Sequence, residues 1–118
     1  MTPSFYFADS NQQTWNPLVL EDGRQIIGVE LKSLVSANGN HLELYRFEPN
    51  ISYPDHYHEG PEFVFILEGT LQQNGQWLKP GWSSAAEKGT LDHDAKSGPE
   101  GCTLLTVYHQ SAYIPPTQ

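Results

Sequence analysis

Hydrophobic residues in this chain alternate with polar ones over short stretches, which is the period of β-strands rather than of helices. We expect strands over residues 15–20, 26–35, 41–47, 63–68, 70–73, 76–78, 82–86 and 102–108. Only residues 1–14 and 83–88 have a composition compatible with a helix, and neither stretch carries an apolar stripe of helical period. Many short strands separated by turn residues predict an all-β sandwich or barrel.

Two dipeptides mark tight turns between these stretches. Asn38-Gly39 and Asn74-Gly75 each predict a two-residue hairpin loop in which both residues have a positive φ. Pro80-Gly81 predicts a further turn. The 118 residues contain no repeat, low-complexity tract or linker, and their number suits one hydrophobic core. We therefore expect a single domain over residues 1–118.

The alternation is clearest around residue 64. Val64 and Ile66 share a face with Glu62, and Phe63 and Phe65 lie on the other face. We expect the first three to line the interior of the barrel. Phe63 and Phe65 are then expected to pack a second layer or an interface.

The charge of the chain excludes some partners. Fourteen acidic and six basic residues give a net charge of -8, which is unsuited to nucleic-acid phosphates and to anionic membranes. Cys102 is the single cysteine, so no intrachain disulfide forms, which favours a reducing compartment. The start of the chain lacks a signal-peptide pattern, and no apolar run approaches the ~20 residues of a membrane span. We expect a cytoplasmic protein that binds neither nucleic acid nor membrane.

The candidate chemistry lies between residues 56 and 62. His56 and His58 are two residues apart, so a strand presents both imidazoles on one face. Glu62 is four residues further, or roughly 13 Å along a straight strand, which is too far to share one metal ion. Gly60-Pro61 must therefore reverse the chain. The segment predicts a strand–turn–strand clamp for a divalent transition metal, with Glu62 as a ligand or as the catalytic base.

His93 is the candidate for a further ligand. Two imidazoles and a carboxylate form the facial triad of non-haem iron chemistry, and a third imidazole makes a four-ligand set with open positions. His56, His58, Glu62 and His93 are thus expected to hold one divalent metal ion per chain. Iron, manganese, nickel and zinc all suit such a site.

These residues resemble a known family, the cupins. The first cupin motif is G-x5-H-x-H-x3-E-x6-G, and residues 50–69 match its spacing from His56 through His58 and Glu62 to Gly69. Asn50 stands at the leading glycine position. The resemblance implies a single cupin domain, a jelly-roll β-barrel with the metal inside.

The second cupin motif, G-x5-P-x-G-x2-H-x3-N, is met in part over residues 81–97. Gly81 and Gly89 are correctly spaced, but Glu87 stands at the proline position. The histidine position holds Asp92, and His93 follows one residue later, which in a regular strand is the opposite face. Three alternatives remain: a bulge brings His93 into the site, Asp92 is the ligand, or there is no fourth ligand.

Residues 56–108 are similar to small cupins of the anti-sigma-factor and acetylacetone-dioxygenase-like group. The similarity rests on residues 56–62, 67–70 and 98–105. It implies a frequent dimer, and the apolar Phe5-Tyr6-Phe7 is suited to pairing with a neighbour's sheet edge. We expect a homodimer.

Three functions fit these observations. The first is a dioxygenase-type metalloenzyme acting on a diketone, phenolic or similar oxygen-rich small molecule, in which the metal is a Lewis acid. The second is a non-catalytic small-molecule or metal-dependent sensor, and the third is a relic that binds adventitious metal. An open metal position beside a pocket of Tyr45, Phe47, Trp82 and Tyr108 would favour the enzyme. A closed four-ligand zinc site would favour the sensor.

Overall fold

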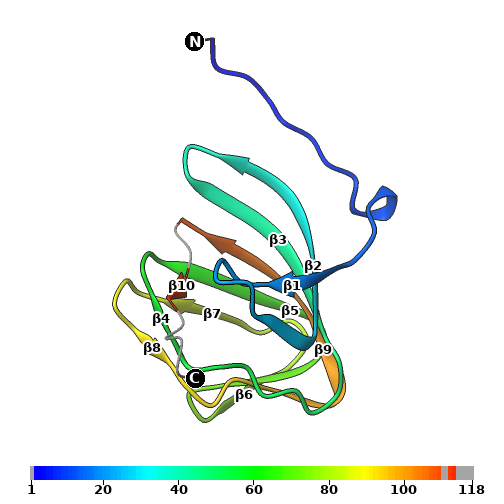
Figure 1. Ribbon diagram of the computed structural model, residues 1–118, viewed down its shortest axis with the longest axis vertical. Helices are drawn as coiled ribbons and strands as arrows, with labels where there is room; N and C mark the ends of the chain where they lie inside the picture. Colours follow the sequence, from blue (N-terminus) through cyan, green and yellow to red (C-terminus); the bar gives the residue numbers. More distant parts are fainter. Residues whose placement is uncertain (1, 110–111, 114–118) are drawn as a thin grey trace.

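The computed structural model describes residues 2–109 and 112–113 and is built almost entirely of strands (Figure 1). Its elements are a short 3-10 turn η1 (Ser10–Gln12) and the strands β1 (Asn16–Val19), β2 (Gln25–Ala37), β3 (Asn40–Phe47), β4 (His56–His58), β5 (Glu62–Gln73), β6 (Gln76–Leu78), β7 (Ser83–Ala86), β8 (Leu91–Asp92), β9 (Lys96–Tyr108) and β10 (Ala112–Tyr113). The predicted all-β class is confirmed. The alternative of a helix over residues 83–88 is wrong, since β7 occupies most of that stretch.

The strands form two sheets. The larger sheet has the order β1-β2-β3-β9-β5-β6, and β7 pairs with residues 62–65 of β5 while β6 pairs with residues 71–73. The smaller sheet has the order β10-β4-β8. Figure 1 shows the long strands curving around one side of the molecule, with β4 and β8 on the other side. The two sheets therefore face each other across an interior.

The predicted hairpin turns are confirmed by their backbone angles. Asn38 and Gly39, between β2 and β3, have φ values of 52° and 83°, and Asn74 and Gly75, between β5 and β6, have 47° and 84°. These are the two-residue turns whose twist matches that of the flanking strands. The turn chemistry thus fixes the pairing register of both hairpins.

Gly69 is required by close packing. Its φ is 71°, and a Cβ atom there would collide with the backbone carbonyl oxygen of Gly101 on β9. The β5–β9 pairing shifts register on both sides of this point, between Ile66 and Glu68 and between Gly69 and Leu71. Residues 63–73, predicted as two strands, are therefore one strand that bends at the glycine.

The core lies between the sheets and follows the predicted alternation along β5. Val64 and Ile66 are 5% and 0% exposed, and Phe63 and Phe65 on the outer face are 54% and 44% exposed. The core cluster also contains Leu18, Ile26, Val29, Phe47, Leu71, Leu78, Cys102 and Leu104. The large sheet therefore buries one face and presents the other to solvent.

The N-terminal segment lies apart from both sheets. It extends away from the barrel in Figure 1, and Phe5, Tyr6 and Phe7 are 84%, 66% and 88% exposed. The homodimer expected through this segment stays a prediction, as does the single domain over residues 1–118.

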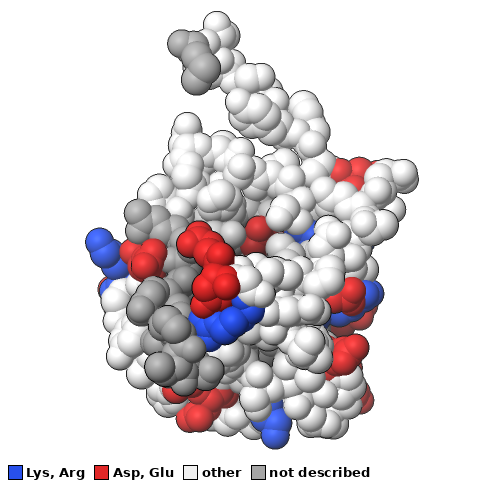
Figure 2. All heavy atoms as spheres, viewed as in Figure 1, with Lys and Arg blue, Asp and Glu red and all other residues white. Residues whose placement is uncertain are grey.

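On the face shown in Figure 2, the blue Lys and Arg side chains of the described residues lie in separate places. No helix in the described part of the chain is long and apolar enough to span a membrane.

Candidate metal site and adjoining cavity

Three polar side chains meet inside the barrel: His56 and His58 from β4 and Asp92 from β8. Strand alternation buries the two imidazoles, which are 6% and 3% exposed, and leaves Tyr57 between them 47% exposed. In the β4–β8 pairing, Asp92 lies directly opposite His56, so its side chain shares the inner face. One donor atom from each of the three residues lies within 4.8 Å of the other two.

The imidazoles are oriented toward the aspartate. His56 Nε2 is 3.4 Å and His58 Nε2 is 3.5 Å from Asp92 Oδ2. On the other side of its ring, His56 Nδ1 donates to the backbone carbonyl of Pro54 at 3.0 Å. This hydrogen bond places the proton on Nδ1 and leaves the Nε2 lone pair facing the cluster, the usual arrangement of a metal-binding histidine.

Two atoms of this cluster are buried without a hydrogen-bond partner among the described residues. They are Nε2 of His58 and Oδ1 of Asp92. Burying such polar atoms unpaired is unfavourable, and a cation between the three side chains would satisfy both. Imidazole nitrogen with carboxylate oxygen is a donor set typical of iron, manganese, nickel and zinc. The residues present therefore fit a divalent transition metal.

The local environment also sets the protonation of the histidines. Burial lowers the pKa of His56, which favours the neutral imidazole that ligates metals. The Asp92 carboxylate raises the pKa of His58, against the opposing effect of burial. Metal binding at His58 would displace a proton that Asp92 otherwise favours.

Glu62 stands beside this cluster and not within it. The chain reverses at Gly60-Pro61 as predicted, because β4 ends at His58 in one sheet and β5 begins at Glu62 in the other. Glu62 Oε1 is 3.9 Å from His58 Nδ1. Burial raises the pKa of Glu62 to about 7, although the neighbouring His58 lowers it. Its roles as ligand and as base both stay predictions.

His93 lies outside the cluster. Its side chain is 46% exposed, its Nδ1 is 2.9 Å from Asp94 Oδ2, and its backbone N–H donates to Asn74 Oδ1. Of the three sequence alternatives, the structure brings Asp92 to the histidines, because one step along β8 reverses the face. The spacing of the second cupin motif already indicated Asp92, and the expectation at His93 gave residue type more weight than position.

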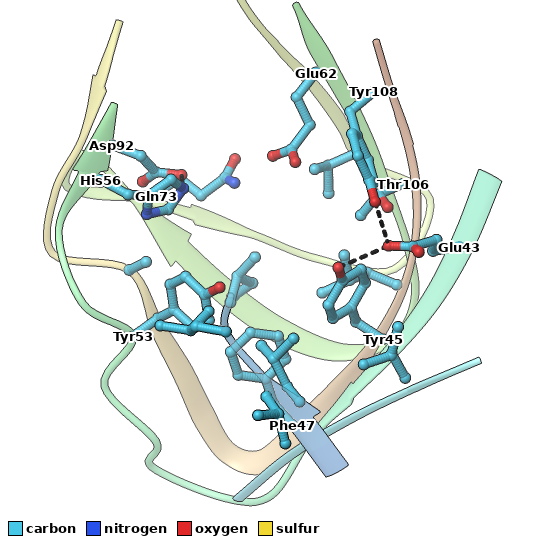
Figure 3. Close-up of a pocket in the computed structure, with 18 of the residues that line it drawn as sticks. Glu43, Tyr45, Phe47, Tyr53, His56, Glu62, Gln73, Asp92, Thr106 and Tyr108 are labelled. Carbon is cyan, nitrogen blue, oxygen red and sulfur yellow. Dashed lines mark hydrogen bonds and ion pairs between the residues drawn. The ribbon is translucent and has the colours of Figure 1, made fainter. Parts of the chain in front are cut away.

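A cavity of about 590 Å³ adjoins the cluster and receives side chains from both sheets (Figure 3). His56, Asp92 and Glu62 line it, so the cluster opens onto this space. The other labelled lining residues are Glu43, Tyr45, Phe47, Tyr53, Gln73, Thr106 and Tyr108. The expected Tyr45, Phe47 and Tyr108 are thus present. Trp82, also expected, is not among the lining residues.

Glu43 and Tyr53 also line the cavity, and no motif in the sequence indicated either of them. Glu43 lies on β3 and is 8% exposed. Its Oε1 accepts hydrogen bonds from the hydroxyls of Tyr45 at 2.8 Å and Tyr108 at 3.0 Å, and its Oε2 accepts one from Ser33 at 3.0 Å. The only local signal was a charged residue on the inward face of a strand, Glu43 having the parity of Tyr45.

Comparison with known proteins identifies the fold. The ChrR cupin-like domain family matches residues 5–112 of this chain. No curated protein matches the sequence.

Solved structures share the architecture at low sequence identity. A Methylibium petroleiphilum protein, provisionally called an acetylacetone dioxygenase, has 14% identity and a TM-score of 0.80 over 99% of this chain and 85% of its own. The Acinetobacter johnsonii acetylacetone dioxygenase has 14% identity and 0.72 over 97% and 78%. A chain from the complex of Rhodobacter sphaeroides SigE with the anti-sigma ChrR has 18% identity and 0.67 over 83% and 49%. The expected cupin fold is confirmed, and these identities carry no more than the fold.

Proposed function

Because this chain belongs to the ChrR cupin-like domain family, we propose that its metal cluster serves catalysis on a small molecule. The proposed activity is of dioxygenase type, on a diketone, phenolic or similar oxygen-rich substrate. One observation carries the proposal: a cluster of three buried donor residues, two of which have atoms without a partner among the described residues, adjoins a cavity of about 590 Å³ that His56 and Asp92 line. Cavities of that size suit small-molecule ligands.

In this proposal His56, His58 and Asp92 hold one divalent metal ion per chain. When bound, the metal supplies a Lewis acid that polarises a substrate oxygen. His56 and Asp92 line the cavity, so a substrate bound in the cavity can place that oxygen next to the cluster. Glu62 is close enough to exchange a proton with a group bound there, and its pKa of about 7 suits a general base near neutral pH.

Part of the remaining lining is apolar and suits the hydrocarbon part of a small molecule. Val64, Leu71 and Leu104 are apolar, and each is 5% exposed or less. Tyr53 packs edge-on against His56, with ring centroids 5.2 Å apart, and fixes the orientation of that imidazole.

A non-catalytic sensor is the second candidate, favoured by the similarity to a chain of the SigE–ChrR complex. It requires no turnover and predicts zinc in a closed site. The open cavity beside the cluster favours the enzyme, because a sensing metal needs no space for a substrate of this size.

Elemental mass spectrometry on protein purified without chelator tests the metal centre. We expect about one iron, manganese or nickel ion per chain, and at least a hundredfold loss of metal affinity in the His56→Ala/His58→Ala variant. His93→Ala is the matched control, because it removes an imidazole next to the cluster without removing a donor from it. Circular dichroism of both variants checks that they are folded.

The reaction is tested by oxygen uptake of the metal-loaded protein with small diketones and phenols. Retention of one metal per chain by the double variant would show that the assigned ligands are wrong. Bound zinc without turnover of any tested substrate would support the sensor instead.

A further inference from the structure

A second polar group lies in the cavity wall formed by β3 and β9, across from the metal cluster in Figure 3. Its centre is Glu43, which accepts three hydroxyl hydrogen bonds, from Tyr45, Tyr108 and Ser33. Among the described residues Glu43 forms no ion pair, so neutral hydroxyl groups alone solvate this buried carboxylate. The group is separate from His56, His58 and Asp92.

Thr106 adds an unsatisfied hydroxyl to this wall. It pairs directly with Glu43 across β3 and β9, lines the cavity and is 4% exposed. Its Oγ1 has no hydrogen-bond partner among the described residues. A hydroxyl buried in this way is unfavourable unless a ligand or an ordered water pairs with it. This atom therefore points to a binding function that the hydrogen bonds of Glu43 alone would not indicate.

The donors and acceptors of the wall determine which ligand groups it suits. Tyr45 and Tyr108 direct their hydroxyl hydrogens to Glu43, so their oxygens present lone pairs only. Glu43 is itself an acceptor, and Thr106 has both a donor and lone pairs. A wall rich in acceptors requires a hydrogen-bond donor from the ligand.

The charge of the cavity points the same way. Besides Glu43, its lining includes the carboxylates Glu21, Asp22, Glu62 and Asp92. The one lining residue with a permanent positive charge is Arg24, whose Nε donates to Asp22 Oδ2 at 2.8 Å. Without metal, carboxylates therefore outnumber cationic side chains in the lining, which disfavours a carboxylate or phosphate group at the Glu43 wall and favours a cationic one.

We propose that Glu43, Thr106 and Tyr108 form a second binding subsite, which recognises a hydroxyl or a protonated amine at the end of the substrate remote from the metal cluster. This inference rests on the proposed function for the other end of the same substrate. The substrate class is narrowed to neutral or cationic molecules with an oxygen-rich head and an alcohol or amine tail. A negatively charged tail is disfavoured.

Four catechols that differ only at the tail test the subsite. Each carries a two-carbon chain at the ring 4-position, ending in ammonium, hydroxyl, methyl or carboxylate; unsubstituted catechol probes the metal end alone. Titration calorimetry without oxygen gives the dissociation constants and keeps the probes intact. We expect the ammonium and hydroxyl probes to bind about tenfold more tightly than the methyl probe, and the carboxylate probe to bind most weakly.

Variants of Thr106 separate a binding role from a structural one. Thr106→Val removes an unpaired buried hydroxyl, so we expect a higher melting temperature of the metal-free protein. The same variant should bind the hydroxyl and ammonium probes about tenfold more weakly and leave the methyl probe unchanged. Thr106→Ser should restore the preference. A lower melting temperature in Thr106→Val would mean that the hydroxyl supports the fold, and would overturn the inference.

Glu43→Gln tests the charge. It keeps an acceptor oxygen for the tyrosines, and we expect it to remove most of the discrimination between the ammonium and carboxylate probes. Equal binding of all four tailed probes by the native protein would overturn the inference of a second subsite. If unsubstituted catechol still bound in that case, the proposed function would stand. Failure of catechol to bind would count against the proposed function, and the difference between the ammonium and methyl probes would still test the wall.

Discussion

The two polar walls of the cavity differ in how their hydrogen bonds are satisfied. On the β4–β8 side, Nε2 of His58 and Oδ1 of Asp92 are buried and have no hydrogen-bond partner within residues 2–109 and 112–113. On the β3–β9 side, both oxygens of Glu43 accept hydrogen bonds, and the hydroxyl of Thr106 is the buried group that lacks a partner in the described part of the chain. The difference teaches that a buried polar group supports the fold where its partners are internal, and is available for a ligand where they are missing.

The strands that carry the two walls differ as well. β3 and β9 pair over seven residues, from His41 with Tyr108 to Phe47 with Cys102. β4 and β8 pair over two residues, His56 with Asp92 and Tyr57 with Leu91. The β4–β8 wall therefore has less support from the backbone, and a metal bound there would stabilise the folded state by mass action.

The largest effect is expected from removing Glu43, whose hydrogen bonds lie within the β3–β9 wall of the cavity. Glu43→Ala removes the acceptor of three hydroxyl groups, and we expect it to lower the free energy of unfolding by about 3 kcal/mol. Urea denaturation of the metal-free protein measures this loss. Metal content should stay at the native level, because Glu43 is not part of the cluster. A loss below about 1 kcal/mol would show that the wall does not support the fold.

The second effect is expected from changing Asp92 in the β4–β8 wall of the cavity. Asp92→Asn keeps the shape of the side chain but removes its charge, and we expect the metal to bind 10–100-fold more weakly. The metal-free protein should change in stability by less than about 1 kcal/mol, because one buried oxygen of Asp92 already lacks a partner among the residues that the structure describes. Competition with a chelating dye measures the affinity, and His93→Ala is the control. An equal loss of affinity in both variants would contradict the placement of Asp92 in the site.

The smallest effect concerns pH and the buried thiol of Cys102 on β9. Burial raises the pKa of Cys102 from 9.0 to about 12, and it also raises the pKa of Tyr53 and Tyr45. The thiol ionises in the unfolded chain before it does in the native state, so its stabilising contribution is complete below pH 9 and declines above it. We expect Cys102 to account for about 1 kcal/mol of stability lost between pH 9 and pH 10.

Urea denaturation at the two pH values measures this loss, and Cys102→Ala should reduce it. A thiol reagent at pH 7 should label Cys102 only after unfolding. Rapid labelling of the native protein would contradict the buried placement of the thiol.

Prediction from the sequence succeeded where the signal is local and periodic. β2, β3 and β5 and the two Asn-Gly hairpins follow from alternation and turn chemistry, which act over a few residues. The short strand β8 was missed, because two residues carry no measurable period, and the strand at His56–His58 was expected only from the spacing of its two histidines. The N-terminal part of β9 was missed for a similar reason, since Gly98, Pro99 and Gly101 are typical of turns.

The metal site shows the same division. His56 and His58 followed from strand alternation and motif spacing, and the structure brings both into the cluster. The choice between Asp92 and His93 as a further ligand depended on which side chain of a short segment faces the histidines. Only the pairing of β8 with β4 reveals that face. Asp92 therefore could be named as an alternative from the sequence but could not be chosen over His93.

By itself, the sequence determined the all-β class, the hairpin turns, the alternation along the central strands and the position of the histidine pair. Only the tertiary structure decided that Asp92 completes the cluster and that Glu43 and Thr106 form the opposite wall. The hydrogen bond from Tyr108 to Glu43 joins residues 65 positions apart, which no local pattern encodes. The physical reason is that side-chain period and turn preference act along the chain, whereas a site depends on which strands pair across it.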